Sequence, residues 1–179
     1  RSELGLPLLR NFTPKEYAAH SQNWAIVQDR RGVIFTANSD GVLEFDGLRW
    51  RLIRTANRTV VRSLAVDDNG RVYVGALGEI GYLAPDANGR AQYVSLLEHV
   101  PEAARDFDDA HHIFVTPRGI YFESYAHLIR LHGDDVKIWT PASAFHRAFL
   151  VGDQLFIRER DRGLMQLGSD DQLQLVPGG

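Results

Sequence analysis

The chain has 179 residues, of which 44% are hydrophobic and 24% charged, and its formal net charge is −3. This composition is typical of a globular protein with an ordinary core, and no apolar run approaches the roughly 18 residues of a transmembrane helix. The slightly acidic charge argues against a nucleic-acid partner, and the absence of cysteine excludes disulfides, thiolate-bound metals and cysteine nucleophiles.

Residues 1–19 precede the first regular unit. The apolar stretch 6–12 would serve as a ring-closing strand in a closed circular fold, and residues 14–19 favour a short helix because a proline occupies the first helical position. The chain begins at Arg1 rather than Met, so we expect either a processed product or an expressed fragment, from which any targeting peptide would already be gone.

An internal repeat follows, because residues 23–46 can be laid over residues 61–84 at a constant offset of 38. The overlay places the turn 29–32 on the turn 67–70, Ile26 on Leu64 and Phe45 on Leu83. A period of about 40 residues built from short strands and tight turns is typical of a β-propeller blade. The repeat therefore predicts an all-β fold.

Two further units share this strand and turn pattern with looser spacing, and residues 97–110 read as a loop insertion with a helical turn near 101–105. We expect a partial β-propeller over residues 20–179, with about four four-stranded antiparallel blades near 22–53, 61–96, 111–140 and 147–176. Closed propellers commonly have more than four blades. The chain is therefore expected to be a fragment of a longer protein.

The first two units resemble the two-component-regulator propeller family. The resemblance rests on residues 22–32, 37–38 and 41–47, with Trp50 and Ile53 closing the unit, and on residues 61–70 and 72–75. Tyr73 replaces the usual tryptophan of the second strand, and the third and fourth units depart most from the pattern.

That resemblance implies a signalling role. Family members carry propellers outside the inner membrane of Gram-negative bacteria, followed by a β-sandwich, a membrane span and a kinase, diguanylate cyclase or DNA-binding output. It implies that this chain is a periplasmic, non-enzymatic module that senses a small molecule or glycan. Two alternatives remain open: a protein-interaction scaffold, and a propeller lyase or glycosidase with paired carboxylates or a His/Tyr site.

Searches for catalytic and metal motifs identify no candidate. The sequence contains no Gly-x-Ser-x-Gly elbow, phosphate loop or His-Glu-x-x-His pair. His111 and His112 are adjacent in a predicted strand, where neighbouring side chains point to opposite faces. The acidic loop with Asp106, Asp108 and Asp109 lacks the glycine and distal glutamate of a calcium hand. We therefore predict no catalytic residue, no metal and no cofactor.

Candidate ligand-binding residues come from loops expected at one rim of the propeller: Asn38, Glu79, Tyr125 and Arg160. In an extended segment, alternation would also place Arg158, Arg160 and Arg162 on one side, where they would bind carboxylate, sulfate or phosphate groups.

Packing between blades is predicted for most aromatic residues of the first two units: Trp24, Phe35, Phe45, Trp50, Tyr73, Tyr82 and Tyr93. The first and last blades of a partial propeller leave flat faces without neighbours. We therefore expect self-association through these faces.

Overall fold

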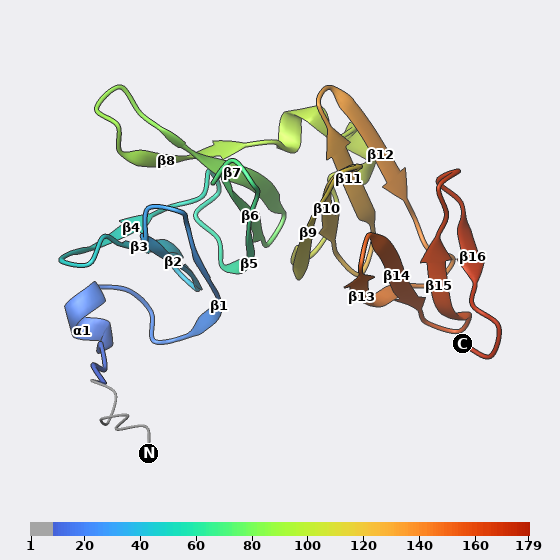
Figure 1. Cartoon of the computed structure of the whole chain (residues 1–179), viewed down its shortest axis with the longest axis horizontal. Helices are drawn as coiled ribbons and strands as arrows, with labels where there is room; N and C mark the ends of the chain where they lie inside the picture. The colour runs from blue at the N-terminus through green and yellow to red at the C-terminus, as the bar shows by residue number, and fades with distance from the viewer. Residues whose placement is uncertain (1–8) are drawn as a thin grey trace, which may run out of the picture.

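A computed structural model describes residues 9–179, and residues 1–8 lie outside the described part. The described chain folds into four separate four-stranded antiparallel sheets, which confirms the predicted propeller fragment of four blades (Figure 1). Blade 1 contains β1 (Asn23–Gln28), β2 (Ile34–Asn38), β3 (Gly41–Phe45) and β4 (Trp50–Ile53). Blade 2 contains β5 (Val61–Val66), β6 (Val72–Ala76), β7 (Glu79–Pro85) and β8 (Ala91–Ser95). Blade 3 contains β9 (His112–Thr116), β10 (Gly119–Glu123), β11 (Leu128–His132) and β12 (Asp135–Trp139), and blade 4 contains β13 (Phe145–Val151), β14 (Gln154–Glu159), β15 (Gly163–Leu167) and β16 (Leu173–Leu175).

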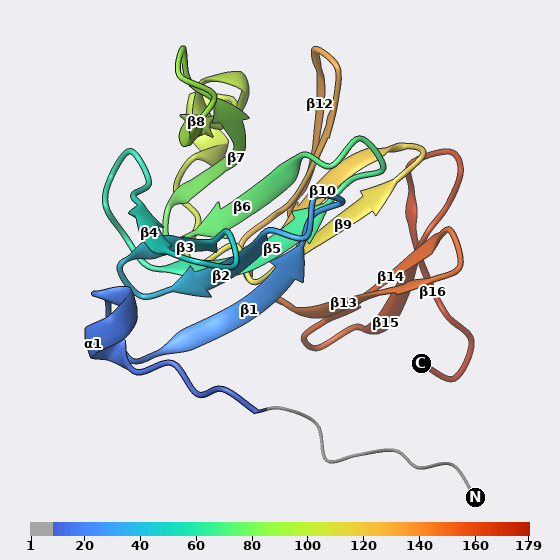
Figure 2. The same ribbon diagram turned by 60° about the vertical axis from the view of Figure 1, so that its left-hand side comes forward.

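Each blade is a meander in which sequential strands are neighbours. Figure 1 shows the four sheets side by side in an open arc, with the first strands β1, β5, β9 and β13 along the concave side. The last strands β4, β8, β12 and β16 lie toward the outside of the arc. Figure 2 shows the same arrangement from the side of blade 1, with α1 (Pro14–Tyr17) next to that blade.

The repeated turns explain why the first two blades match at a fixed offset. The Oδ1 atom of Asp29 accepts hydrogen bonds from the backbone N–H groups of Arg31 and Val33, at 2.9 and 3.1 Å. In the same way, Oδ1 of Asp67 accepts hydrogen bonds from the backbone N–H groups of Asn69 and Arg71, at 2.9 and 2.8 Å. Each turn ends at a glycine with φ of +83°, a backbone angle that favours glycine.

Three apolar cores hold the arc together, one between each pair of neighbouring blades. Phe35 and Val42 pack with Val61 and Val74 between blades 1 and 2. Between blades 2 and 3, Tyr73 contacts Phe122 with a ring-centroid distance of 6.4 Å. The third core joins blades 3 and 4 and includes the following buried side chains: Tyr121, Leu128, Phe145, Ile157 and Met165.

A charged cluster adds a polar contact between blades 3 and 4. Asp171, in the turn between β15 and β16, accepts hydrogen bonds from Arg118, from Arg130 at 2.8 Å and from Lys137 at 2.9 Å. Its backbone carbonyl accepts a fourth bond from Trp139 Nε1 at 2.9 Å. Burial alone would raise the pKa of Asp171, but the hydrogen bonds and charges of Lys137 and Arg130 outweigh burial and lower it.

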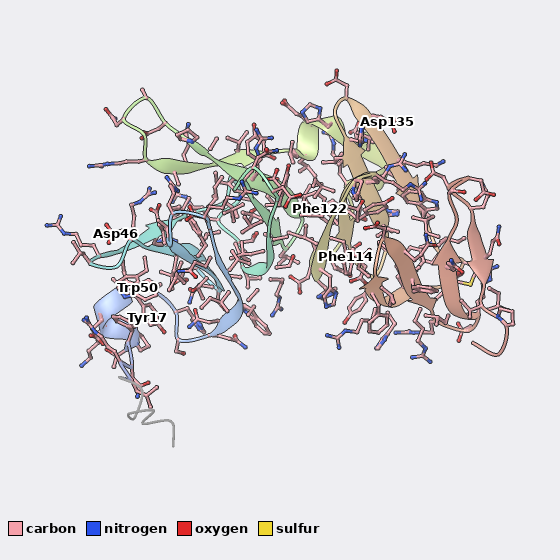
Figure 3. The ribbon with its side chains drawn as sticks, viewed as in Figure 1. Tyr17, Asp46, Trp50, Phe114, Phe122 and Asp135 are labelled. Atoms are coloured by element: carbon pink, nitrogen blue, oxygen red, sulfur yellow. The ribbon has the colours of Figure 1, made fainter. Side chains whose placement is uncertain are left out.

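The described part of the N-terminal segment packs on the outer face of blade 1. Phe12 lies 5.0 Å from Phe45 and 5.2 Å from Trp50, measured between ring centroids, and Tyr17 of α1 lies 5.7 Å from Trp50 (Figure 3). Residues 9–19 pair with no strand. Of the stretch 6–12, which we expected as a ring-closing strand, residues 6–8 lie outside the described residues.

Short helices occur where the sequence favours them, at α1 and at two 3₁₀ turns, Leu97–His99 and Glu102–Ala104. The predicted packing of three aromatic residues between blades is wrong. Phe45 and Trp50 lie on the face of blade 1 that α1 covers, and Trp24 is 42% exposed. Trp24 is exposed because the register of its strand, β1, shifts between Asn23 and Ala25.

Candidate functional site

Three of the four inner strands carry a β-bulge at their first residues. The register shifts between Asn23 and Ala25 in β1, between residues 61 and 63 in β5, and between residues 145 and 147 in β13. The extra residues are Trp24, Arg62 and His146. A bulge turns one side chain away from its regular direction, and bulges are common beside functional sites.

These side chains meet at one end of the inner strands. Together with His112, the first residue of β9, they line a cavity of about 600 Å³, completed by Asp109, His111, Tyr125 and Arg147. We call this space the mouth cavity. Every blade therefore contributes to it, so a single small molecule bound there would contact all four blades.

Arg62 connects blades 1 and 2 to the segment that enters blade 3. Its Nε atom donates to Asp109 Oδ2 at 3.0 Å, and its guanidinium group lies 3.7 Å from the ring centroid of Trp24. The indole nitrogen of Trp24 donates to Ser39 Oγ at 3.3 Å. This wall of the cavity is thus held by a charged contact and a cation–π contact.

His112 lines the cavity on the side of blade 3, and the buried Glu123 contacts it. Nδ1 of His112 lies 2.6 Å from Oε2 of Glu123, whose side chain is fully buried. An ionised carboxylate only accepts hydrogen bonds, so Nδ1 is then the donor. This contact leaves Nε2 of His112 as the nitrogen available to an occupant.

Neighbouring His111 packs against Tyr125 with tilted rings, at a ring-centroid distance of 4.3 Å and an interplanar angle of 48°. Burial lowers the pKa of His111, and the charges of the Glu123 and Asp109 carboxylates only partly oppose that shift, so burial favours the neutral imidazole. Its Nε2 atom and Asp109 Oδ1 are both buried without a hydrogen-bond partner in the described structure. A buried polar atom without a hydrogen-bond partner costs free energy unless a ligand or a water molecule supplies that partner.

The cavity combines polar atoms with aromatic surface. Trp24 and Tyr125 are 42% and 43% exposed. Ligand sites typically join a few placed polar groups to apolar and aromatic walls. By contrast, nowhere in residues 9–179 do three or more histidine, aspartate or glutamate side chains gather closely enough to hold a metal ion.

Of the four residues predicted from the rim loops, the structure places only Tyr125 in the mouth cavity. Asn38 is buried, and its Nδ2 donates to the carbonyls of His20 and Gln22 at 2.6 and 3.1 Å. This side chain fixes the entry into blade 1, and a ligand role for it stays a prediction.

Glu79 is also buried and accepts a hydrogen bond from Ser95 Oγ at 2.6 Å. Burial, and secondly the charge of Glu79, raise the pKa of Tyr93. Arg160 is exposed on the loop after β14, where its carbonyl accepts from Ser143 Oγ at 3.1 Å. Ligand roles for Glu79 and Arg160 likewise stay predictions.

The predicted alternation of three arginines fails after β14. The strand ends at Glu159, Asp161 has a φ of +63°, and the chain turns back. Arg162 therefore pairs with the buried Glu159, at 3.1 Å, instead of lying beside Arg158.

Sequence reasoning missed most of the cavity because its residues are spread from position 24 to position 147 and none of them stands out by itself. One signal was available: the repeat offset of 38 places Trp24 on Arg62, the first two bulged residues. A repeat position whose residue type differs between blades is a reasonable candidate for a specificity position in a propeller.

Comparison with known proteins identifies the fold. No protein-family model matches the chain, and no curated protein matches it. The chain is similar to the extracellular domain of BT3049 from B. thetaiotaomicron, with a TM-score of 0.64, 13% identity, and coverage of 97% of this chain and 25% of that one. It is similar to the extracellular domain of BT4673 from the same organism, with a TM-score of 0.63, 16% identity, and coverage of 87% and 21%.

A third similar structure is virginiamycin B lyase from Staphylococcus aureus, with a TM-score of 0.60, 14% identity, and coverage of 85% and 54%. At such identities the likeness shows the fold, which is that of a β-propeller. BT3049 is described as a putative hybrid two component system, and BT4673 as a putative one component or hybrid two component system. The chain spans about a fifth to a quarter of the length of these two domains. No helix within residues 9–179 is long and apolar enough to cross a membrane.

Proposed function

We propose that this chain is a non-catalytic signal-input module of a bacterial membrane signalling protein, located in the periplasm, and that a small molecule or glycan fragment binds in its mouth cavity. The observation that carries the proposal is the convergence of one side chain from each inner strand on a single cavity of about 600 Å³. That volume lies within the usual range for small-molecule sites, roughly 300–1,000 Å³. The two similar extracellular domains support a sensing role.

The cavity would couple binding to the shape of the arc. Trp24 lies on blade 1 and Arg147 on blade 4, and Arg62 reaches Asp109 in the connection between blades 2 and 3. An occupant that contacts both Trp24 and Arg147 would bind more tightly to one curvature of the arc of blades than to others. A ligand shifts a conformational equilibrium by its difference in affinity between the states.

A binding screen tests the proposal, with sugars and small organic acids as probes and calorimetry as the readout. We expect the affinity of a hit to fall up to about tenfold in Tyr125→Ala, since the contact of one aromatic ring contributes about 0.5–1.5 kcal/mol. Phe149→Ala is the matched control, because Phe149 is 46% exposed on blade 4 and does not line the cavity. Equal losses in both variants, or no saturable binding of any probe, would contradict the proposal.

A lyase is the second candidate, because His112 pairs with a buried carboxylate and one similar structure is a lyase. The proposed module predicts binding without turnover. Product formed by the wild type and lost in His112→Asn would favour the lyase instead. A protein-interaction scaffold would bind no small molecule at the mouth cavity.

A further inference from the structure

Two arginines lie opposite each other on blade 4, and one of them, Arg147, lines the mouth cavity. Arg147 on β13 is the direct cross-strand partner of Arg158 on β14, and both side chains are exposed. Like charges directly opposite each other in an antiparallel pair are destabilising. Within residues 9–179, neither arginine has an acidic group within ion-pair distance.

Nearby acidic groups already contact other side chains. Asp109 accepts from Arg62, Glu123 contacts His112, and Glu159 pairs with Arg162. The charge of Arg147 is therefore not balanced from any side of the cavity that the structure describes. An anion is the simplest partner that would relieve its repulsion with Arg158.

Other groups in the cavity would contact the uncharged part of such an anionic ligand. His146, the bulged residue of β13, precedes Arg147 and also lines the cavity, as does His112 with its free Nε2. Asp109 Oδ1 is a buried acceptor without a partner, which a hydroxyl group would satisfy. Tyr125 offers a partly exposed ring against which a sugar or aromatic ring would stack.

We propose that the mouth cavity selects an anionic ligand: a small ring-bearing molecule whose carboxylate or sulfate group binds Arg147, with Arg158 adding to the positive field. This inference rests on the proposed function and specifies the class of ligand. Arginine suits the task because its planar guanidinium binds both groups through two parallel hydrogen bonds.

Three probes of similar size test it by calorimetry at constant ionic strength: D-glucuronate, glucose 6-sulfate and D-glucose. We expect at least one acidic probe to bind about tenfold more tightly than glucose, through a charge-assisted bidentate contact, and its affinity to weaken as salt is raised. Arg147→Ala should remove this preference for the acidic probe over glucose, and Arg147→Lys should keep part of it. Arg90→Ala is the control, because Arg90 lies in the turn between β7 and β8 of blade 2 and does not line the cavity.

Thermal melting of the same variants separates binding from a structural role. Removing one of two opposed arginines should leave the melting temperature unchanged or raise it, whereas a marked drop would show that Arg147 supports the fold and would overturn the inference. If glucose binds as tightly as the acidic probes, with binding lost in Tyr125→Ala, the sensor proposal stands and the anion inference is wrong. If neither acidic probe binds at millimolar concentration, the anion inference is wrong. If the wider screen also finds no ligand, the proposed function fails as well.

Discussion

Replacement of Asp171 by asparagine tests how far the charged cluster holds blades 3 and 4 together. Asparagine keeps the shape and tolerates the φ of +64° at this position, but it lacks the charge. The carboxylate is 17% exposed, and its partners Arg118, Arg130 and Lys137 are 35%, 10% and 38% exposed. The variant therefore leaves three cations close together, with only Asp135, which is 66% exposed, beside them.

The expected cost lies between two limits. A hydrogen bond to a buried charge contributes about 1.5–3 kcal/mol, whereas a fully exposed ion pair contributes about 0.2–1 kcal/mol. For this partly buried cluster we expect the free energy of unfolding to fall by about 2 kcal/mol, which lowers the melting temperature of a chain of this size by about 4–8 °C. Urea denaturation and thermal melting, followed by circular dichroism, measure both quantities.

The pH dependence gives the same reasoning a second check. Because the folded state lowers the pKa of Asp171, its contribution is present above the unfolded value of about 3.9 and is lost as the pH falls below it toward the folded pKa. The stability difference between wild type and Asp171→Asn should therefore be full near pH 7 and shrink in that acidic range. Asp134→Asn is the control, since Asp134 is exposed in the turn between β11 and β12. A loss in Asp171→Asn no larger than in this control would refute the argument.

Two further outcomes follow from the packing. Gly75→Ala should cost about 1–3 kcal/mol in urea denaturation, because a Cβ there would lie 2.3 Å from Ser63 Oγ and 2.7 Å from the carbonyl oxygen of Ala110; an unchanged midpoint would mean that blades 2 and 3 separate easily. We also propose that the chain self-associates through the outer face of blade 4, where Phe149 and Val151 are 46% and 64% exposed. Light scattering should then show dimers or larger species at micromolar concentration that Phe149→Arg dissociates, and a wild-type mass of 20.2 kDa throughout that range would argue against it.

The sequence alone determined the local structure of the blades. Asp29 with Gly32, and Asp67 with Gly70, specify their turns through hydrogen bonds that span at most four residues, so their spacing is visible in one dimension. The alternation of apolar residues along each strand then determined which face is buried, and the repeat of 38 residues determined the length of one blade. These features predicted an all-β meander fold with short helices only before the first blade and between the second and third blades.

Only the tertiary structure decided what each blade presents to its neighbours. The contact of Arg62 with Asp109 joins residues 47 apart in sequence, and that of Arg118 with Asp171 joins residues 53 apart. Trp24 has the apolar character of a core residue, yet a single bulge turns it into the mouth cavity. The site depends on such long-range contacts and register shifts, whose free energies come from several blades packed at once, and no local pattern of residues records them.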